Sequence, residues 1–305
     1  DETGSHEELA AVYEEVAESV PRGPLAERMY LVLARVQDEH LDDPDEAEAA
    51  LRKILEFDPA NPNALEMLAA IFHRRGRAQE YVVALEQKLE AASSIEERKA
   101  ILREIARVYE EQLDDSLEAA STLIRAIELE PDLQTVEVLT ALYRREKNWP
   151  QVAVCLLRSR DLAQDPAHQA QLQLSVGVVY ERELQDDEAA VEAYGVVLAF
   201  DPGHPEALEA LERLYVKLDR PSELLQVYER QLEATVDVRA KVTVLFKSAG
   251  IWEDRFNDLT NADACLQLAL SIDPGNLQVI RGLERLRRAQ SNWEGLMEVL
   301  GHHIQ

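Results

Sequence analysis

Residues 176–202 read VGVVYERELQDDEAAVEAYGVVLAFDP, and the order of residue types in this stretch predicts two helices joined by a short acidic turn. Apolar and small residues recur at helical spacing on both sides of the turn, as on two amphipathic helices that pack together. Asp186-Asp187 stands where a helix N-cap is expected, because carboxylates accept hydrogen bonds from the first N–H groups of a helix. Asp201-Pro202 marks the end of the second helix, since proline cannot continue it.

The same arrangement recurs along the whole chain with steps of 71 or 72 residues. The acidic residue before proline recurs in four places, at Asp58-Pro59, Glu130-Pro131, Asp201-Pro202 and Asp273-Pro274. A small residue inside a helix recurs with the same steps, at Ala34, Ala106, Gly177 and Ala249. A third set consists of Leu9, Tyr81, Val152, Leu224 and Leu296. Three independent sets with one period indicate an internal repeat.

Each repeat unit of about 72 residues divides into two helix pairs whose apolar residues follow the i, i+3, i+4 spacing of a buried stripe. All twelve prolines fall at helix junctions or in first turns, which agrees with this division. Glycine is scarce and Ala, Leu and Glu are abundant, which also favours helix. We therefore predict an all-α chain with a flexible segment at 1–7, a leading helix at 8–19 and eight helix pairs over 24–305.

The repeat resembles the tetratricopeptide repeat family, whose pattern is W-x2-L-G-x2-Y, then A-x3-F, then P. Val176-Gly177 with Tyr180, then Ala190, Tyr194 and Pro202, is the best match in the chain. The resemblance covers nearly all 305 residues, but the units average 36 rather than about 34 residues and the leading Trp is absent. The half-a-tetratricopeptide repeat, a close relative, fits as well. The resemblance implies a single right-handed α-α superhelix, or α-solenoid, that spans 1–305 and forms part of a longer chain.

The charge of the chain excludes several classes of partner. It has 59 acidic and 32 basic residues, a net charge of −27 and a pI near 4.6. Such a chain repels phosphate backbones and anionic membrane surfaces, so we expect no nucleic-acid partner and no membrane insertion. The longest apolar run lies near 152–157, far short of a spanning helix. With no signal-peptide pattern at the N-terminus, we predict a cytoplasmic location.

The sequence lacks the motifs that are typical of catalytic, phosphate-binding and metal sites. We therefore predict that the protein is not an enzyme and has no cofactor or metal. No two glycines stand at i, i+2, no histidine belongs to an H-E-x-x-H motif, and no histidine lies within four residues of a cysteine. Cys155 and Cys265 are interpreted as small buried apolar residues. The recurrent acidic clusters, such as Asp114-Asp115, lack the glycine of a calcium loop and are interpreted as N-caps.

Basic residues recur on the first helix of each pair, which the resemblance places on the concave wall. They are candidate partner-binding residues, namely Arg35, Arg74, Arg107, Arg144, Arg145, Arg213, Lys217, Arg281 and Arg285. Several of them lie in the last turn of their helix, where basic side chains also complement the helix dipole. Acidic residues occupy similar places in alternate pairs, so the predicted wall is mixed. The asparagine needed for the carboxylate clamp of this family is missing from first-helix interiors.

The resemblance implies a non-catalytic scaffold or adaptor that binds a peptide or helix of a partner protein on the concave surface. The negative charge favours a basic partner. The alternative is a structural or self-assembling segment of a larger repeat protein, which would associate through exposed solenoid ends. For this alternative, Leu296, Val299, Leu300 and Ile304 would form an uncovered apolar end.

Overall fold

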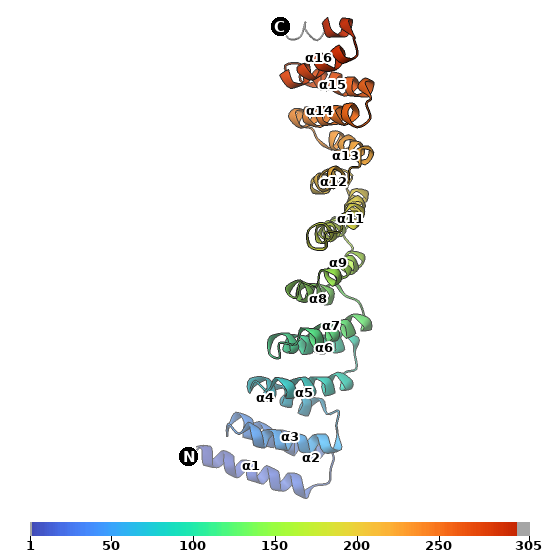
Figure 1. The fold of residues 1–305 in the computed structure, drawn as a ribbon. Helices are drawn as coiled ribbons and strands as arrows, with labels where there is room; N and C mark the ends of the chain where they lie inside the picture. Colours follow the sequence, from blue (N-terminus) through green and yellow to red (C-terminus); the bar gives the residue numbers. More distant parts are fainter. Residues whose placement is uncertain (1, 298–305) are drawn as a thin grey trace. The chain divides into compact units, whose positions relative to one another are not determined.

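The computed structural model describes residues 2–297, and every regular element in that range is helical, as predicted. The chain divides between Asn148 and Trp149 into two compact units, which we call unit 1 and unit 2. Unit 1 contains α1 (Glu2–Ser19), α2 (Pro24–Glu39), α3 (Pro44–Phe57), α4 (Pro62–Arg74), α5 (Ala78–Ala91), α6 (Ile95–Glu111), α7 (Ser116–Leu129) and α8 (Leu133–Arg145) (Figure 1).

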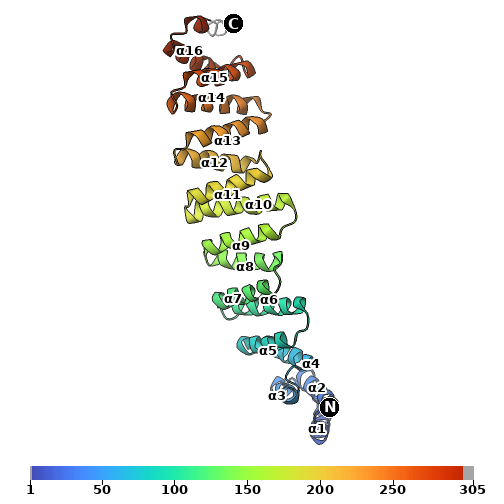
Figure 2. The same ribbon diagram turned by 90° about the vertical axis from the view of Figure 1, so that its right-hand side faces the viewer.

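Unit 2 continues the same alternation of helices and short turns (Figure 2). It contains α9 (Trp149–Leu162), α10 (Pro166–Val178), a π-helical segment η1 (Val179–Leu184), α11 (Asp187–Phe200), α12 (Pro205–Lys217), α13 (Pro221–Ala234), α14 (Val238–Asp254), α15 (Leu259–Ile272) and α16 (Leu277–Ala289). A further helical segment occupies residues 293–297.

Within each unit the helices pack pairwise in chain order. The first helices of the pairs are α2, α4, α6 and α8 in unit 1, and α10, α12, α14 and α16 in unit 2. The second helices are α3, α5 and α7 in unit 1, and α9, α11, α13 and α15 in unit 2. This sequential packing is that of an α-solenoid, in which each pair buries its apolar faces against its neighbours.

One aspartate has two roles in the turn of every second helix pair. These pairs are α2–α3, α6–α7, α10–α11 and α14–α15. In the first pair, the N–H of Asp43 donates to the carbonyl of Gln37 and so closes α2. The carboxylate of the same residue accepts from the N–H of Glu46 and caps α3. The residue before it, Asp42, has a φ of 52°, the left-handed conformation in which many helix termini reverse the chain. Asp115, Asp186 and Asp258 repeat this geometry at the repeat interval, which confirms the N-cap prediction for Asp115 and Asp186.

The apolar core of each unit lies between its packed helices. In unit 1 it is continuous from Ala10 to Ala126, and in unit 2 it forms separate clusters around Tyr194 and Leu266. The recurrent small residues Ala34, Ala106, Gly177 and Ala249 are all buried. A small residue at this place lets the second helix approach closely, because a larger side chain would fill the space between the two helices.

Three details differ from the sequence prediction. The leading helix begins at Glu2 rather than at residue 8, since a run with Glu near its start suits the positive end of a helix. Leu296 is 8% exposed rather than uncovered. The turn before it folds the segment back onto α16, where Arg287 donates to the carbonyl of Gly295 at 2.7 Å. Val299, Leu300 and Ile304 lie outside the described residues. The π-helical segment η1 was not predicted.

Candidate functional site

The nine candidate basic residues all lie on first helices and all are exposed, but most of them are neutralised by ion pairs. Six bind carboxylates, in the pairs Arg74–Asp38 at 2.5 Å, Arg107–Glu104 at 2.6 Å, Arg145–Glu110 at 2.6 Å, Arg213–Glu181 at 3.1 Å, Lys217–Asp187 at 2.6 Å and Arg285–Glu253 at 2.6 Å. Arg35, Arg144 and Arg281 have no ion pair with any residue in 2–297. The wall of first helices is therefore mixed in charge rather than uniformly basic.

Four of the six acidic partners in these pairs follow the repeat. Asp38, Glu110, Glu181 and Glu253 each stand four residues after the recurrent small residue. In unit 1 the partner is a basic residue in the last turn of the following first helix, as in Arg145 with Glu110. In unit 2 the partner stands one turn earlier on that helix, as in Arg213 with Glu181. These pairs cross-link successive first helices within each unit, and this pairing was not foreseen from the sequence.

In unit 1 the first helices α6 and α8 line an open hollow of about 520 Å³. Its lining includes Arg103, Glu104, Arg107, Glu110, Glu111, Gln134 and Val138. We call it the α6–α8 hollow. The guanidinium of Arg103 donates to the side-chain oxygen of Gln134 and so joins the two helices. Val138 is 41% exposed and is the large apolar side chain on this wall.

Of the nine candidates, only Arg107 lines this hollow. The sequence prediction considered only basic residues, so it could not include Gln134 or Val138, and it also omitted Arg103, a basic residue on the same helix as Arg107. The available signal was their position on the first helices. Gln134 and Val138 stand four residues apart on α8, and Arg103 stands four residues before Arg107 on α6. Residues at this spacing share one helix face.

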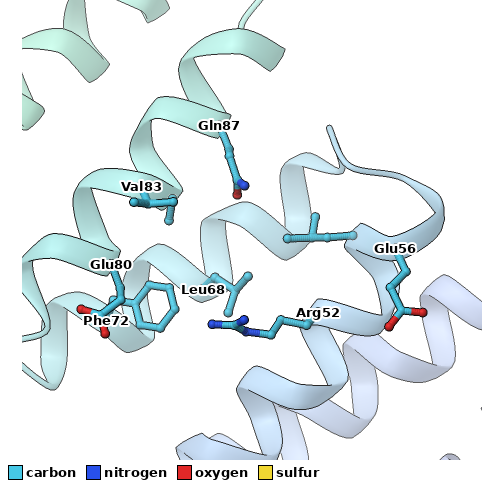
Figure 3. A pocket seen from close by; sticks show the side chains of 9 residues that line it. Arg52, Glu56, Leu68, Phe72, Glu80, Val83 and Gln87 are labelled. Carbon is cyan, nitrogen blue, oxygen red and sulfur yellow. The ribbon is translucent and has the colours of Figure 1, made fainter.

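A second hollow in unit 1, of about 500 Å³, lies between the second helices α3 and α5, over α4 (Figure 3). Leu68 and Phe72 of α4 form its floor, and Arg52, Glu80 and Val83 stand at its edges. The polar side chains at its edges already have partners within the chain. Arg52 donates to Glu48 at 2.6 Å, and Glu80 accepts from Arg77 at 3.1 Å. We call this the α3–α5 groove.

Unit 2 has a hollow of about 470 Å³ between α12, α13 and α14, with Glu212 in its wall. The carboxylate of Glu212 accepts hydrogen bonds from Lys247 at 2.7 Å, from Gln231 at 3.1 Å and from Tyr228 at 3.3 Å. Burial alone would raise the pKa of Glu212, but these hydrogen bonds and the charge of Lys247 outweigh it and hold that pKa below its usual value. Glu212 is thus a structural acceptor that joins three helices.

Residues 2–297 contain no group of three or more histidine, cysteine or acidic side chains placed to hold a metal ion. Neither cysteine forms a disulfide within residues 2–297. Cys155 is buried as expected, and Cys265 is half-buried, where burial and the charge of Glu229 raise the pKa of its thiol. None of the helices in the described range combines the length and the apolar character that crossing a membrane requires.

Comparisons with known proteins agree with the helical repeat. Residues 27–61 and 207–241 each match a family model described as tetratricopeptide repeat, one in each unit. No curated protein sequence matches this chain.

Three solved structures are reported for comparison. The C-terminal part of a tetratricopeptide repeat-containing protein from Cytophaga hutchinsonii is 16% identical, with 84% of this chain and 99% of that chain covered and a TM-score of 0.36. A tetratricopeptide repeat protein from Parabacteroides merdae is 14% identical, with 85% and 98% covered and a TM-score of 0.35. YrrB, described as a tetratricopeptide repeat protein with an unusual peptide-binding site, is 20% identical, with 66% and 98% covered and a TM-score of 0.36.

The family models match one helix pair in each unit. Helix pairs of this kind follow one another through residues 2–297. The predicted resemblance to the tetratricopeptide repeat family is confirmed, since models of that repeat match residues 27–61 and 207–241.

Proposed function

We propose that this protein is a non-catalytic interaction scaffold that binds a peptide or helix of a partner protein on the face of its first helices. Tetratricopeptide repeat domains generally mediate protein–protein interactions. The observation that supports a specific place is the α6–α8 hollow, because it is walled by two successive first helices and contains both polar and apolar side chains. A peptide needs both kinds of contact, polar groups for its backbone and an apolar surface for its side chains.

The chemistry of the hollow favours a partner with basic and apolar residues. Its wall contains three glutamates, Glu104, Glu110 and Glu111, against the two arginines Arg103 and Arg107. The whole chain carries a net charge of −27, which would speed the encounter with a basic segment at low salt. Arg107 is exposed, so its pair with Glu104 contributes little to stability and can be exchanged for a contact with the partner.

Selection from a display library of random peptides tests this proposal. Peptides recovered with the wild-type chain should be enriched in Lys, Arg and apolar residues, and their affinity should fall as salt rises. The variant Val138→Glu places a charge on the exposed apolar wall of the hollow and should weaken the selected peptides by about tenfold or more.

Val83→Glu is the matched control, because Val83 is 59% exposed in the α3–α5 groove of the same unit. It should leave the affinity unchanged. If Val83→Glu abolishes binding and Val138→Glu does not, the α6–α8 hollow is not the binding surface. If no peptide is enriched over an unrelated acidic protein, the scaffold proposal itself fails.

A further inference from the structure

Unit 1 contains a further hollow, of about 440 Å³, between the second helices α5 and α7 and over the start of α6, which packs against both. Leu89 of α5, Leu102 of α6 and Leu129 of α7 form its apolar lining. The other lining residues are charged, namely Glu86, Glu90, Arg98, Arg125 and Glu128. We call it the α5–α7 hollow. Its volume lies in the range in which proteins bind small ligands.

One end of the α5–α7 hollow is closed by an ion pair. Arg125 of α7 donates to both carboxylate oxygens of Glu86 of α5, at 2.7 Å and 3.1 Å. On each of these two helices the remaining lining residues, at 89–90 and 128–129, follow the ion pair in the chain. A long segment that ran on between α5 and α7 would have to break this bidentate pair. The hollow therefore suits a small ligand better than a continuous segment.

Arg98 is the side chain that this hollow leaves without an acceptor. It is partly buried, and its guanidinium has no hydrogen bond or ion pair with any residue in 2–297. Its Nε atom is buried and has no partner. A charged donor that is withdrawn from water without an acceptor is unfavourable. A ligand that brings an anionic acceptor into the hollow would remove this cost.

The corresponding region of unit 2 indicates which acceptor suits an arginine here. Gln169 stands 71 residues after Arg98, and its side-chain amide donates to a backbone carbonyl at 2.7 Å. The arginine of this region, Arg160, donates to the carboxylate of Asp161 at 2.7 Å and to the side-chain oxygen of Gln173 at 2.6 Å. Unit 2 thus gives its arginine a carboxylate from the same chain, whereas Arg98 has none within the described residues.

Two acidic residues of the hollow are also without a cation. Glu90 of α5 and Glu128 of α7 are exposed, and neither has an ion pair with a described residue. Since they do not reach Arg98, the hollow presents separated charges of opposite sign beside its leucines. A small molecule with a carboxylate and an ammonium group on one carbon would meet both signs at once. A ligand with several negative charges would be repelled by the glutamates.

We propose that the α5–α7 hollow binds a free apolar α-amino acid such as leucine. Arg98 donates to the carboxylate of the ligand, and Glu90 and Glu128 accept from its ammonium group. The three leucines of the lining contact its side chain. Arg98 stands in the first turn of α6, whose positive end adds to the attraction for the carboxylate. This site is distinct from the α6–α8 hollow and takes a ligand of another class.

Isothermal titration calorimetry with leucine, leucinamide and N-acetyl-leucine tests the proposal. The three share a side chain, but leucinamide lacks the carboxylate and N-acetyl-leucine lacks the ammonium group. Leucine should bind the whole chain with a Kd of about 1 mM or below, and each analogue should bind at least about tenfold more weakly. The proposal is overturned if leucine, isoleucine and phenylalanine show no saturable binding up to about 10 mM.

The analogues also identify a different ligand. If leucinamide binds as tightly as leucine, no carboxylate is recognised and the proposal is wrong. If N-acetyl-leucine binds as tightly as leucine, the hollow takes the C-terminal residue of a polypeptide rather than a free amino acid, which also overturns the proposal.

Two matched variants localise the binding. Arg98→Gln removes the cation and introduces the residue type found at the corresponding place in unit 2, so it should fold normally and weaken leucine by about tenfold or more. Arg28→Gln, at an exposed arginine of α2 without an ion pair in the described range, should leave the affinity unchanged. Leucine should raise the melting temperature of the wild type and of Arg28→Gln, but not of Arg98→Gln.

Circular dichroism should give the same helix content for both variants. Wild-type affinity in Arg98→Gln would overturn the proposal, because the ligand would then bind elsewhere. Equal weakening in Arg98→Gln and Arg28→Gln would overturn it as well, because the effect would follow the total charge and not the hollow.

Discussion

The ring of Tyr194 lies so close to the backbone of Gly177 that a Cβ added to Gly177 would stand 2.5 Å from Cε1 of that ring. The three equivalent places in the chain pair an alanine with a leucine, as in Ala106 and Leu123. In this repeat the glycine supplies the space that the larger ring occupies. The hydroxyl of Tyr194 then donates to Glu181 at 2.7 Å, and the same carboxylate pairs with Arg213. The small residue at position 177 and the large ring at position 194 thus bring α10, η1, α11 and α12 into one set of contacts.

Gly177→Ala should destabilise unit 2 by about 1–3 kcal/mol, because the added methyl group must displace a buried ring. The double variant Gly177→Ala with Tyr194→Leu restores the pairing of the other repeats and should recover most of this loss, apart from the bond to Glu181. Hydrogen exchange of the α10 and α11 amides, which reports local stability in a repeat protein, measures both effects. Equal protection in Gly177→Ala and the wild type would contradict the steric explanation.

Glycine should be the favoured residue at both of two left-handed turn positions. Gln185 has a φ of 55° and Gly76 a φ of 65°, a region that glycine adopts without strain. Gln185→Gly should therefore stabilise the protein by about 0.5–1 kcal/mol, and Gly76→Ala should destabilise it by about 1 kcal/mol. Urea denaturation followed by circular dichroism checks both. A destabilised Gln185→Gly variant would mean that the side chain makes a contact that offsets the strain.

Glu212 should make the stability of unit 2 depend on acid pH. Its pKa is lower in the folded chain than in the unfolded chain, so the ionised form stabilises the fold above a pH of about 4.3. This stabilisation is lost as the pH falls through the folded pKa. The difference in free energy of unfolding between the wild type and Glu212→Gln should therefore narrow as the pH is lowered from about 7 to about 3. A difference that stays constant over this range would show that the charge of Glu212 is unimportant.

Lys99 should be a stronger determinant of stability than the other lysines of unit 1. Its side chain is 4% exposed and its ammonium group lies 3.0 Å from Asp132. Burial opposes the charged form, but the hydrogen bond and charge of Asp132 raise the pKa of Lys99. Lys99→Met should cost about 2 kcal/mol, because it leaves the carboxylate of Asp132 without its cation.

Lys88→Met is the control for this measurement. Lys88 pairs with Glu66, whose side chain is 67% exposed, and such a pair contributes less than about 1 kcal/mol. Thermal unfolding of the two variants at one pH compares them. Equal melting temperatures would contradict the special role of Lys99.

Helix positions and most turns could be predicted from this sequence, because the information for them is local. Proline at first turns, aspartate at N-caps and apolar residues at helical spacing act on residues close to them in the chain, and Asp115 at the start of α7 is an example. The π-helical segment η1 was not predicted, because the choice between an α-helical and a π-helical backbone hydrogen bond leaves no clear pattern in residue type. The pairing of Arg213 with Glu181 was also missed, since it joins side chains 32 residues apart.

The amino-acid sequence alone determined the repeat, its length and its division into helix pairs, because these depend on the order of residue types within about one helical hairpin. The tertiary structure decided which charges remain free to meet a partner. Arg144 and Arg145 are neighbours on α8 and are alike in sequence, yet Arg145 is paired with Glu110 and Arg144 has no ion pair within residues 2–297. Glu110 lies on α6 and Arg145 lies on α8, so these two side chains meet only after the helices pack. The mixed charge of the α6–α8 hollow arises from that packing.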